Sequence, residues 1–534
     1  MLKHLFNRPS YQPCDLAIAF GLPMEESGSL GFCGSNKPAR VNAWFDALPV
    51  TDYGTTCTQL YHALPELIKV KLSTSHRADI LEHIRPLILR SVASVTTPLT
   101  RHPLNLNEAE KKIATIAQAS LKYLAAAYCR NAINALAENK NDSTLAAKYT
   151  HRSLHALALL LKSNYRLYTP VPNSIWRMIN TFYHFSRDKD FHSKLVRDPV
   201  DNQQSGTIDQ LYLRILALAS ARPLQLRPSE VENLYNLLPE WSRQLKLDSY
   251  QETQQGLFAV LSCSDREPDY TDTFTQEELE KDGLVFDFQT LLTNLDNQND
   301  ERSGINLASG LRNHLQQHWG TRVQRRNTRS QCEEQYEVCL GLTGVHSQLI
   351  KGGNFEEFVL GSSAQDTLPI GSKNNWTSSP KEAGNVAIIT MQAQNTGPKG
   401  FQLRCQDVIP AHLQTGELLG FREPGKRHWQ LAVIRWLKRS DKRGVELGAQ
   451  VIAHRIEAFG AATITSSGRD SDYLRVLLIK ESVDNVAESI VTPSLVFSDR
   501  HPITLKKRGE SQRIQLGQSL LVTPSFTHFR YKTL

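Results

Sequence analysis

The 534-residue sequence has few cysteines and no long hydrophobic run, and both absences narrow the possible classes of protein. Its eight cysteines are scattered without a Cys-x-x-Cys pair, which argues against a disulfide framework and a cysteine-bound zinc site. No apolar run reaches the ~18 residues that a membrane-spanning helix needs, and the N-terminus lacks the apolar core of a signal peptide. We therefore expect a cytoplasmic protein with free thiols and no direct membrane insertion.

The sequence also lacks a strong excess of charge and the common catalytic motifs. Its formal charge of +7, from 61 basic and 54 acidic residues, does not by itself imply a polyanionic partner. The histidines form no His-Glu-x-x-His motif, and no Gly-x-Ser-x-Gly elbow is present. Residues 420–427 nearly match a phosphate-binding P-loop, but Arg427 stands where Ser or Thr should bind magnesium. We therefore expect no enzyme activity, no catalytic residues, no metal site and no cofactor.

The N-terminal half is dominated by helical patterns. Residues 1–54 are rich in Gly, Pro, Ser and Asn, and we interpret them as an irregular arm. Apolar residues at helical intervals then predict an α-helical, repeat-like domain over 55–262. Ser229, with Glu232 three positions later, is a candidate capping box. The predicted helices are 57–67, 77–92, 108–138, 143–165, 175–185, 208–221 and 229–247.

The C-terminal half has a linker-like start and then strand patterns. Acidic and polar sequence over 263–303 is typical of an interdomain linker, and a short helix over 305–319 follows it. Short apolar runs between Gly, Pro and charged turns predict an antiparallel β-barrel over 304–455 and an additional β domain over 456–534. The predicted fold class is α+β multidomain, with an N-terminal all-α helical array, a C-terminal antiparallel β-barrel and a second small β unit.

An arginine-rich segment lies just before the first predicted strands of the barrel. Arg325 and Arg329 are spaced i, i+4, Arg326 lies between them, and Arg322 with Arg326 has the same spacing. Two guanidinium groups so spaced can offer paired donors to phosphate or to the O6/N7 edge of guanine. We prefer the pair Arg325 and Arg329 as the primary contacts.

A second segment, 395–400, supplies groups that complement these arginines. The side-chain amide of Asn395 can pair with a purine edge that presents both a donor and an acceptor. Gly397 and Gly400 allow the backbone to approach a ligand without a Cβ in the way.

At these two segments the sequence resembles the PilZ domain family. The family has Arg-x-x-x-Arg on a leading loop, followed by Asp/Asn-x-Ser-x-x-Gly within a small β-barrel, and it binds the bacterial second messenger cyclic di-GMP. Trp429, Trp436 and Gly448 also stand in places similar to those of the closing PilZ strands. The resemblance implies PilZ ligand-binding positions at Arg325, Arg329, Asn395, Gly397, Gly400, Arg326, Arg322 and Gly448.

Two features depart from the family pattern. Gly397 stands where the family usually has Ser, so one hydroxyl contact is missing, and a polar insertion at 346–384 lengthens the interval between the two segments. Both departures favour an alternative, a ligand-independent PilZ-fold scaffold in a surface or motility complex. The basic run 322–329 also leaves direct nucleic-acid binding open, although we do not expect a nucleic-acid polymer as partner. The function that the resemblance implies is a cyclic di-GMP receptor that signals through its helical domain to a protein partner in motility, pilus, adhesion or biofilm control.

Overall fold

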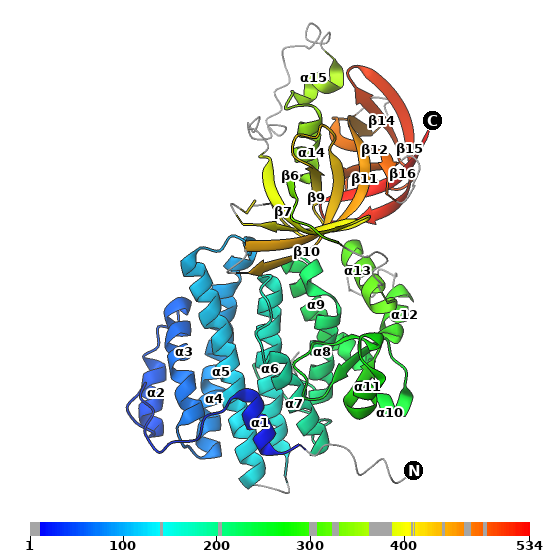
Figure 1. Ribbon diagram of the computed structural model, residues 1–534. Coiled ribbons are helices and arrows are strands. Elements are labelled where there is room, and N and C mark those ends of the chain that lie inside the picture. Colours follow the sequence, from blue (N-terminus) through cyan, green and yellow to red (C-terminus); the bar gives the residue numbers. More distant parts are fainter. Residues whose placement is uncertain are drawn as a thin grey trace. The chain divides into compact units, whose positions relative to one another are not determined.

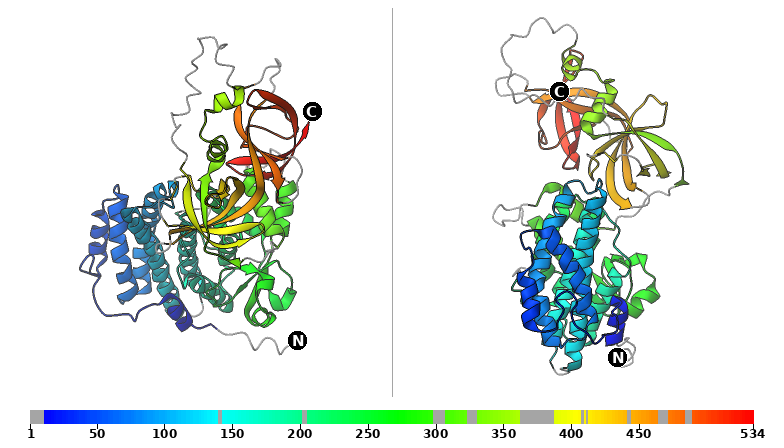
Figure 2. Two further views of the ribbon diagram at one scale, coloured as in Figure 1. Left: turned by 45° about the horizontal axis from the view of Figure 1, so that its top comes forward. Right: turned by 90° about the vertical axis from the view of Figure 1, so that its left-hand side faces the viewer.

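The computed structural model divides the chain into two compact units, drawn in Figures 1 and 2, and each is described by itself. The helical unit comprises Met1–Pro223, Arg227–Leu307 and Leu311–Val323, and the β unit comprises Leu224–Leu226, Ala308–Gly310 and Gln324–Leu534. None of the described helices has the length and apolarity that crossing a membrane requires. The described residues are 11–138, 142–200, 205–297, 307–322, 330–361, 387–406, 409–410, 412–440, 444–463, 471–483 and 489–534.

The helical unit is built mainly from antiparallel helices that bury their apolar faces against one another (Figure 1). The longest, α5 (Glu108–Glu138), packs against α3, α4 and α6 and buries Leu121, Leu124 and Tyr128 along one face. The seven predicted helices correspond to α3–α9, so the helical array is confirmed. The others in this series are α3 (Tyr53–Lys69), α4 (Thr74–Thr96), α6 (Thr144–Arg166), α7 (Ile175–Asp188), α8 (Ile208–Ser220) and α9 (Pro228–Trp241).

The segment that we interpreted as an irregular arm contains two further helices, α1 (Pro13–Phe20) and α2 (Pro38–Asp46). Proline occupies the first turn of both, where its missing N–H has no intrahelical partner to lose. Gly21 ends α1 in the left-handed conformation, with φ of 60°. The Pro and Gly content therefore reflects helix starts and stops, and the expected arm is folded over 11–54.

The predicted linker over 263–303 likewise contains regular structure, and its strands pair with strands at the end of the range 55–262, where we expected only helices. Strands β1 (Asp248–Ser249), β2 (Phe258–Leu261), β3 (Asp269–Tyr270) and β4 (Gly283–Phe286) form an antiparallel sheet in the order β1-β4-β2-β3. The acidic residues that suggested a linker begin α11 (Gln276–Asp282), where Glu278 accepts from the Thr275 amide at 2.8 Å and the Thr275 hydroxyl accepts from the Glu278 amide at 3.2 Å. The remaining elements here are α10 (Tyr250–Thr253) and α12 (Gln289–Asn297).

The capping box that we expected at the start of α9 is formed by different residues. Glu230 accepts from the backbone amide of Arg227 at 2.8 Å, and Pro228 takes the first helical position. The capping residue thus lies two positions earlier than expected, and the predicted pair Ser229 and Glu232 is replaced by Arg227 and Glu230.

Aromatic rings anchor α13 (Ser309–Gly320), the helix that leads to the arginine segment. Trp319 is fully buried, stacks on Phe288 with ring centroids 4.2 Å apart, and meets Trp241 edge-on at 6.2 Å. The Tyr270 hydroxyl donates to the His318 carbonyl at 3.2 Å. Beyond the helix, Arg322 forms an ion pair with Asp272. The chain is therefore anchored within the helical unit up to Arg322.

The described strands of the β unit form a twelve-stranded sheet that closes into two barrels. The first runs β10-β9-β6-β7-β8-β11 and closes through β10–β11 pairing, and the second runs β11-β12-β13-β16-β15-β14 and closes through β11–β14 pairing. In Figure 2 the orange and red strands of the second lie beside the yellow and gold strands of the first. The strands are β5 (Ser330–Gln331), β6 (Gln335–Leu340), β7 (Ile389–Gly397), β8 (Gly400–Cys405), β9 (Leu418–Arg422), β10 (Gln430–Ser440), β11 (Gly444–Thr463), β12 (Leu474–Ser482), β13 (Ser489–Pro493), β14 (Pro502–Lys507), β15 (Glu510–Val522) and β16 (Phe526–Thr533).

Strand β11 belongs to both barrels. Its first half, from Gly444 to Ala453, pairs with β10, and its second half, up to Thr463, pairs with β12 and β14. Where β11 leaves the first barrel and enters the second, the buried side chains belong to one continuous apolar cluster, which includes Ala453, Ile456 and Leu477. The boundary that we placed at 455/456 therefore runs through an uninterrupted strand and a shared core.

Part of the predicted polar insertion is folded. Residues 341–361 form α14 (Gly341–Leu349) and α15 (Phe355–Leu360), while 362–384 lie outside the described residues. Burial lowers the pKa of His346 to about 4, and its Nε2 lies 3.1 Å from the Phe459 carbonyl oxygen of β11. Helix α14 therefore packs on strands of both barrels, β6 and β9 as well as β11 and β12, and α15 packs on β14 of the second barrel.

Candidate functional site

The segment 395–400 forms the tip of the β7–β8 hairpin. Gly397 pairs with Gly400 across a two-residue turn. A Cβ at Gly400 would lie 2.5 Å from the Ala449 carbonyl oxygen of β11, so only glycine fits there. The Val451 amide donates to the Lys399 carbonyl at 3.1 Å, which holds the turn against β11. The glycine of the motif thus serves close packing between strands.

One row of residues crosses four strands on the outer face of the first barrel. Asn395 pairs with Gln402, Gln402 with Gly448, and Gly448 with Trp436, which joins β7, β8, β11 and β10. The Asn395 amide donates to the Gln402 side-chain oxygen at 2.8 Å. A Cβ at Gly448 would lie 1.9 Å from Trp436 Nε1, so the indole lies directly over this glycine. Side chains alternate along a strand, so these four residues face away from the buried Leu403 and Leu447.

Arg435 lies beside this row at an irregularity of β10. The register of β10 against β11 shifts between Ile434 and Trp436, and both Arg435 and Trp436 are partly buried. Arg435 Nε donates to the side-chain oxygen of Gln450 at 2.8 Å, and burial lowers the pKa of this guanidinium. The outer face of the first barrel therefore carries a positively charged group next to an indole and two side-chain amides.

The short strand β5 brings the chain that follows the arginine segment to this same face. Ser330 pairs with Thr396 and Gln331 pairs with Asn395. Arg325, Arg326 and Arg329 lie outside the described residues. Ser330, the first described residue after Arg329 in the sequence, is thus paired with Thr396, next to Asn395.

Arg322 is placed differently from the other predicted site residues. It forms an ion pair with Asp272 in the helical unit, and both side chains are 42% exposed. The alternative pairing of Arg322 with Arg326 therefore begins at an arginine that already has an acidic partner. Exposed ion pairs contribute little, about 0–1 kcal/mol, so this contact can be exchanged.

An aromatic cluster supports the hairpin from within the barrel. Tyr336 of β6 stacks with Phe401 of β8 at 5.7 Å, and Phe421 of β9 packs edge-on against both. Burial, together with a hydrogen bond to Glu334, raises the pKa of Tyr336 to about 12. Phe401 is the neighbour of Gln402 on β8, so this cluster lies behind the outer row and packs β6, β8 and β9 together.

Sequence patterns identified part of this face and missed the rest. Asn395 and Gly448 lie in the row itself, whereas Trp429 is buried in the core with Arg422 stacked on its ring at 4.5 Å. Gln402 and Arg435 were missed. The alternation of apolar and polar residues in 400–405 signals that Gln402 points outward, but no local pattern marks Arg435.

The chemistry of the face suits recognition of a planar polar ligand. Side-chain amides pair with purine edges, an indole stacks on a base, and guanidinium groups bind phosphate. Within the described ranges no group of three or more His, Cys, Asp or Glu side chains is placed to hold a metal ion. The face is therefore suited to binding a nucleotide through its bases and phosphates.

Comparison with known proteins gives consecutive matches along the chain. Residues 39–253 match the family model "Cyclic-di-GMP receptor FimW, N-terminal domain", residues 257–385 and 361–457 match "Cyclic-di-GMP receptor FimW, middle PilZ domain", and residues 459–534 match "FimW C-terminal beta-barrel domain". The curated Cyclic-di-GMP receptor FimW of Pseudomonas aeruginosa is 26% identical over 575 aligned residues, covering 97% of this chain and 93% of that protein. No solved structure matches.

Proposed function

Because the chain belongs to the PilZ domain family, in the three-domain form of the FimW receptors, we propose that it is a receptor for cyclic di-GMP. The observation that supports this proposal is the β5–β7 pairing, in which Ser330 and Gln331, the two residues that follow Arg329 in the sequence, pair with Thr396 and Asn395. Both motifs then serve one ligand on the outer face of the first barrel. The dinucleotide is the ligand, and no further cofactor is needed.

In this proposal Arg325 and Arg329 bind the phosphates and the guanine edges through paired donors. Asn395 binds a guanine base, oriented by its hydrogen bond to Gln402. Gly400 allows the close approach of β8 to β11, which supports the turn that contains Gly397.

Several further residues contribute charge and shape. Gly448 lets the Trp436 indole lie flat against β11 as a stacking surface for a base. Arg435 adds positive charge next to it, and Arg326 adds charge from the arginine segment. Arg322 joins them by exchanging its exposed ion pair with Asp272 for the ligand.

The position of the arginine segment in the chain supports a signalling role. The chain before it is anchored in the helical unit through Trp319, and the chain after it is anchored in the β unit from Ser330. A ligand that binds the arginines of this segment therefore acts on the chain that connects the two units. The helical unit passes this change to a protein partner in motility, pilus, adhesion or biofilm control. Because a second messenger acts inside the cell, the receptor works in the cytoplasm.

Calorimetric titration of the full chain with cyclic di-GMP tests the proposal, with GTP as control ligand. We expect saturable binding that falls about 5- to 150-fold in Arg325→Ala and Arg329→Ala, since one forked arginine contributes ~1–3 kcal/mol. The matched control is Arg513→Ala, which removes an exposed arginine of the second barrel and should leave affinity unchanged. Absence of binding to the unmodified chain would instead favour the ligand-independent scaffold.

A further inference from the structure

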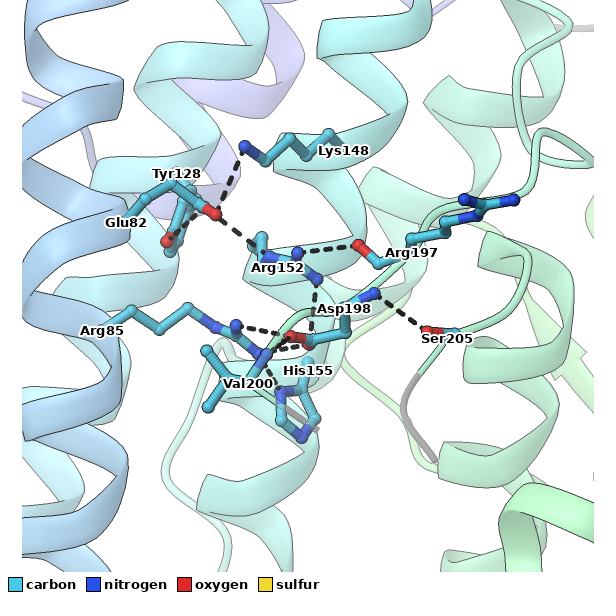
Figure 3. Close-up of polar contacts among 10 residues, drawn as sticks. All are labelled: Glu82, Arg85, Tyr128, Lys148, Arg152, His155, Arg197, Asp198, Val200 and Ser205. Carbon is cyan, nitrogen blue, oxygen red and sulfur yellow. Dashed lines mark hydrogen bonds and ion pairs between the residues drawn. The ribbon is translucent and has the colours of Figure 1, made fainter. Parts of the chain in front are cut away.

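Two buried arginines of the helical unit converge on one carboxylate (Figure 3). Arg85 of α4 and Arg152 of α6 are 1% and 0% exposed, and Asp198 is 3% exposed. Arg85 donates to both Asp198 oxygens, from Nη1 at 2.9 Å and from Nη2 at 2.5 Å, and Arg152 Nη1 lies 2.9 Å from Asp198 Oδ2. The two guanidinium groups, one from each of two helices that pack on α5, thus converge on a binding position for a carboxylate.

The groups around the arginine pair hold it in place without neutralising it fully. Glu82 lies 3.6 Å from Arg152 Nε, and the Nδ1 of His155 lies 3.2 Å from Arg85 Nη2. Burial, followed by the nearby arginines, lowers the pKa of His155 well below its ordinary value and that of His151 to about 3, so both rings are neutral. Neither ring nitrogen of His151 has a hydrogen-bond partner among the described residues. The cluster therefore favours an anion and retains unsatisfied polar groups.

The carboxylate that binds the two arginines, that of Asp198, belongs to a segment at the edge of the helical unit. Asp198 lies between α7 and α8, in a stretch whose neighbouring apolar side chains are turned outward, with Leu195 69% and Val200 43% exposed. Val196 is buried and exchanges two backbone hydrogen bonds with Gly206, at 2.9 and 3.0 Å. The segment 196–200 is therefore held by its carboxylate, by the Arg197 carbonyl, which accepts from Arg152 Nη2 at 3.0 Å, and by its backbone pairing with Gly206. Of these contacts, the one with the carboxylate is electrostatic, and another carboxylate can compete for it.

We propose that Arg85 and Arg152 form a carboxylate-binding site of the helical unit, which Asp198 occupies until an acidic segment of a partner protein replaces it. This inference rests on the proposed function, in which the helical unit acts on a protein partner, and it specifies the chemistry of that partner. The arginines are preorganised by α4 and α6, and the exposed Leu195 and Val200 offer apolar contacts next to the site. Asp198 competes at the high effective concentration of an intramolecular ligand.

Hydrogen exchange on the unmodified full chain tests whether the segment leaves its site in the native state. We expect the amides of Val196 and Gly206 to exchange at least about tenfold faster than amides in the middle of α6, through an opening insensitive to low urea. If the two amides exchange only as fast as those of α6, the segment leaves by global unfolding alone, and the inference is overturned.

Peptide binding tests the site itself. The probe is a fluorescein-labelled peptide with the chain's own sequence over 194–200, and the control peptide has Asn in place of its single Asp. We expect Asp198→Ser to bind the probe at least about tenfold more tightly than the unmodified chain, because the internal competitor is gone. An unrelated peptide with one aspartate between apolar residues should displace the probe, and the Asn peptide should not bind.

Two outcomes of this titration contradict the inference. One is a folded Asp198→Ser chain that does not bind the probe, and the other is equal binding of the Asp and Asn peptides. If Asp198→Ser fails to fold, the hydrogen-exchange result on the unmodified chain is the test of the inference. A cyclic di-GMP titration of Asp198→Ser should match the unmodified chain. Failure of the unmodified chain to bind cyclic di-GMP would overturn the proposed receptor function while leaving the peptide result interpretable.

Discussion

The two barrels of the β unit use a glycine of the same strand in different ways. In the first barrel, Gly448 of β11 lies under the Trp436 indole, and the row around it is partly exposed. In the second barrel, Gly460 lies under α15, where a Cβ would come within 2.6 Å of Val359 Cγ2 and 3.5 Å of Phe355 Cζ. Each glycine lets a side chain lie against the strand.

The difference lies in what covers each glycine. Val359 is buried and comes from a helix that also bonds to the β14–β15 turn, since the Arg508 amide donates to the Phe358 carbonyl at 2.6 Å. Trp436 belongs to the barrel itself and has amide and guanidinium neighbours. The second barrel thus closes its outer face with the chain's own insertion, while the first keeps polar groups and a ring accessible. This difference is why we propose ligand recognition on the first barrel.

The largest expected effect concerns the cover of the second barrel, through His346. Its folded-state pKa of about 4 lies below the ordinary 6.5, so the unfolded chain takes up a proton first as pH falls. The contribution of His346 to the free energy of unfolding is fully present above about pH 6.5. It decreases as the pH falls towards about 4, by up to about 3 kcal/mol.

Calorimetric melting between pH 7 and pH 4 checks this expectation. Other buried histidines contribute as well, for example His528, whose pKa burial lowers to about 4. The comparison is therefore between the unmodified chain and His346→Gln, which should lose less stability over this range. His454→Gln, at an exposed position, is the control. Identical pH profiles for the unmodified chain and His346→Gln would contradict the role of His346.

The paired substitutions Gly448→Val and Gly460→Val separate the two barrels directly. Gly448→Val displaces the Trp436 indole and should lower cyclic di-GMP affinity about 5- to 150-fold, because stacking of a base on an aromatic ring contributes ~1–3 kcal/mol. Gly460→Val collides with Val359 and should destabilise the fold by about 1–3 kcal/mol without changing affinity. Calorimetric titration and thermal melting of both variants provide the test. Equal loss of affinity in the two would remove the distinction between the barrels.

Local patterns in the sequence predicted much of this architecture. The apolar stripe of 108–138 predicted α5 at its observed bounds, and alternating residues located β8 over 400–405. The motif residues Asn395 and Gly400 were selected by their type and spacing, and both lie in the β7–β8 hairpin. These features depend on residues that are close to one another in the chain, so a single sequence is enough to predict them.

Features that depend on distant residues were missed. The acidic residues near Glu278 resemble a linker in composition, yet they cap α11, whose Leu279 packs in the core of the small sheet. The sharing of β11 depends on how both barrels close, which no local pattern specifies. Gln402 and Arg435 reach the candidate site through cross-strand register, so their role follows only from the folded pairing.

The smallest expected effect concerns one side chain of the row. Gln402→Ala removes the acceptor that orients the Asn395 amide and should weaken cyclic di-GMP binding by about 1 kcal/mol, roughly fivefold, the contribution of a single hydrogen bond. The matched change in the second barrel is Gln515→Ala on β15, which should leave affinity unchanged. Titration calorimetry at one salt concentration measures both. If Gln402→Ala binds as tightly as the unmodified chain, the Asn395 amide needs no such support, and the arginine segment and the stacking surface account for recognition without it.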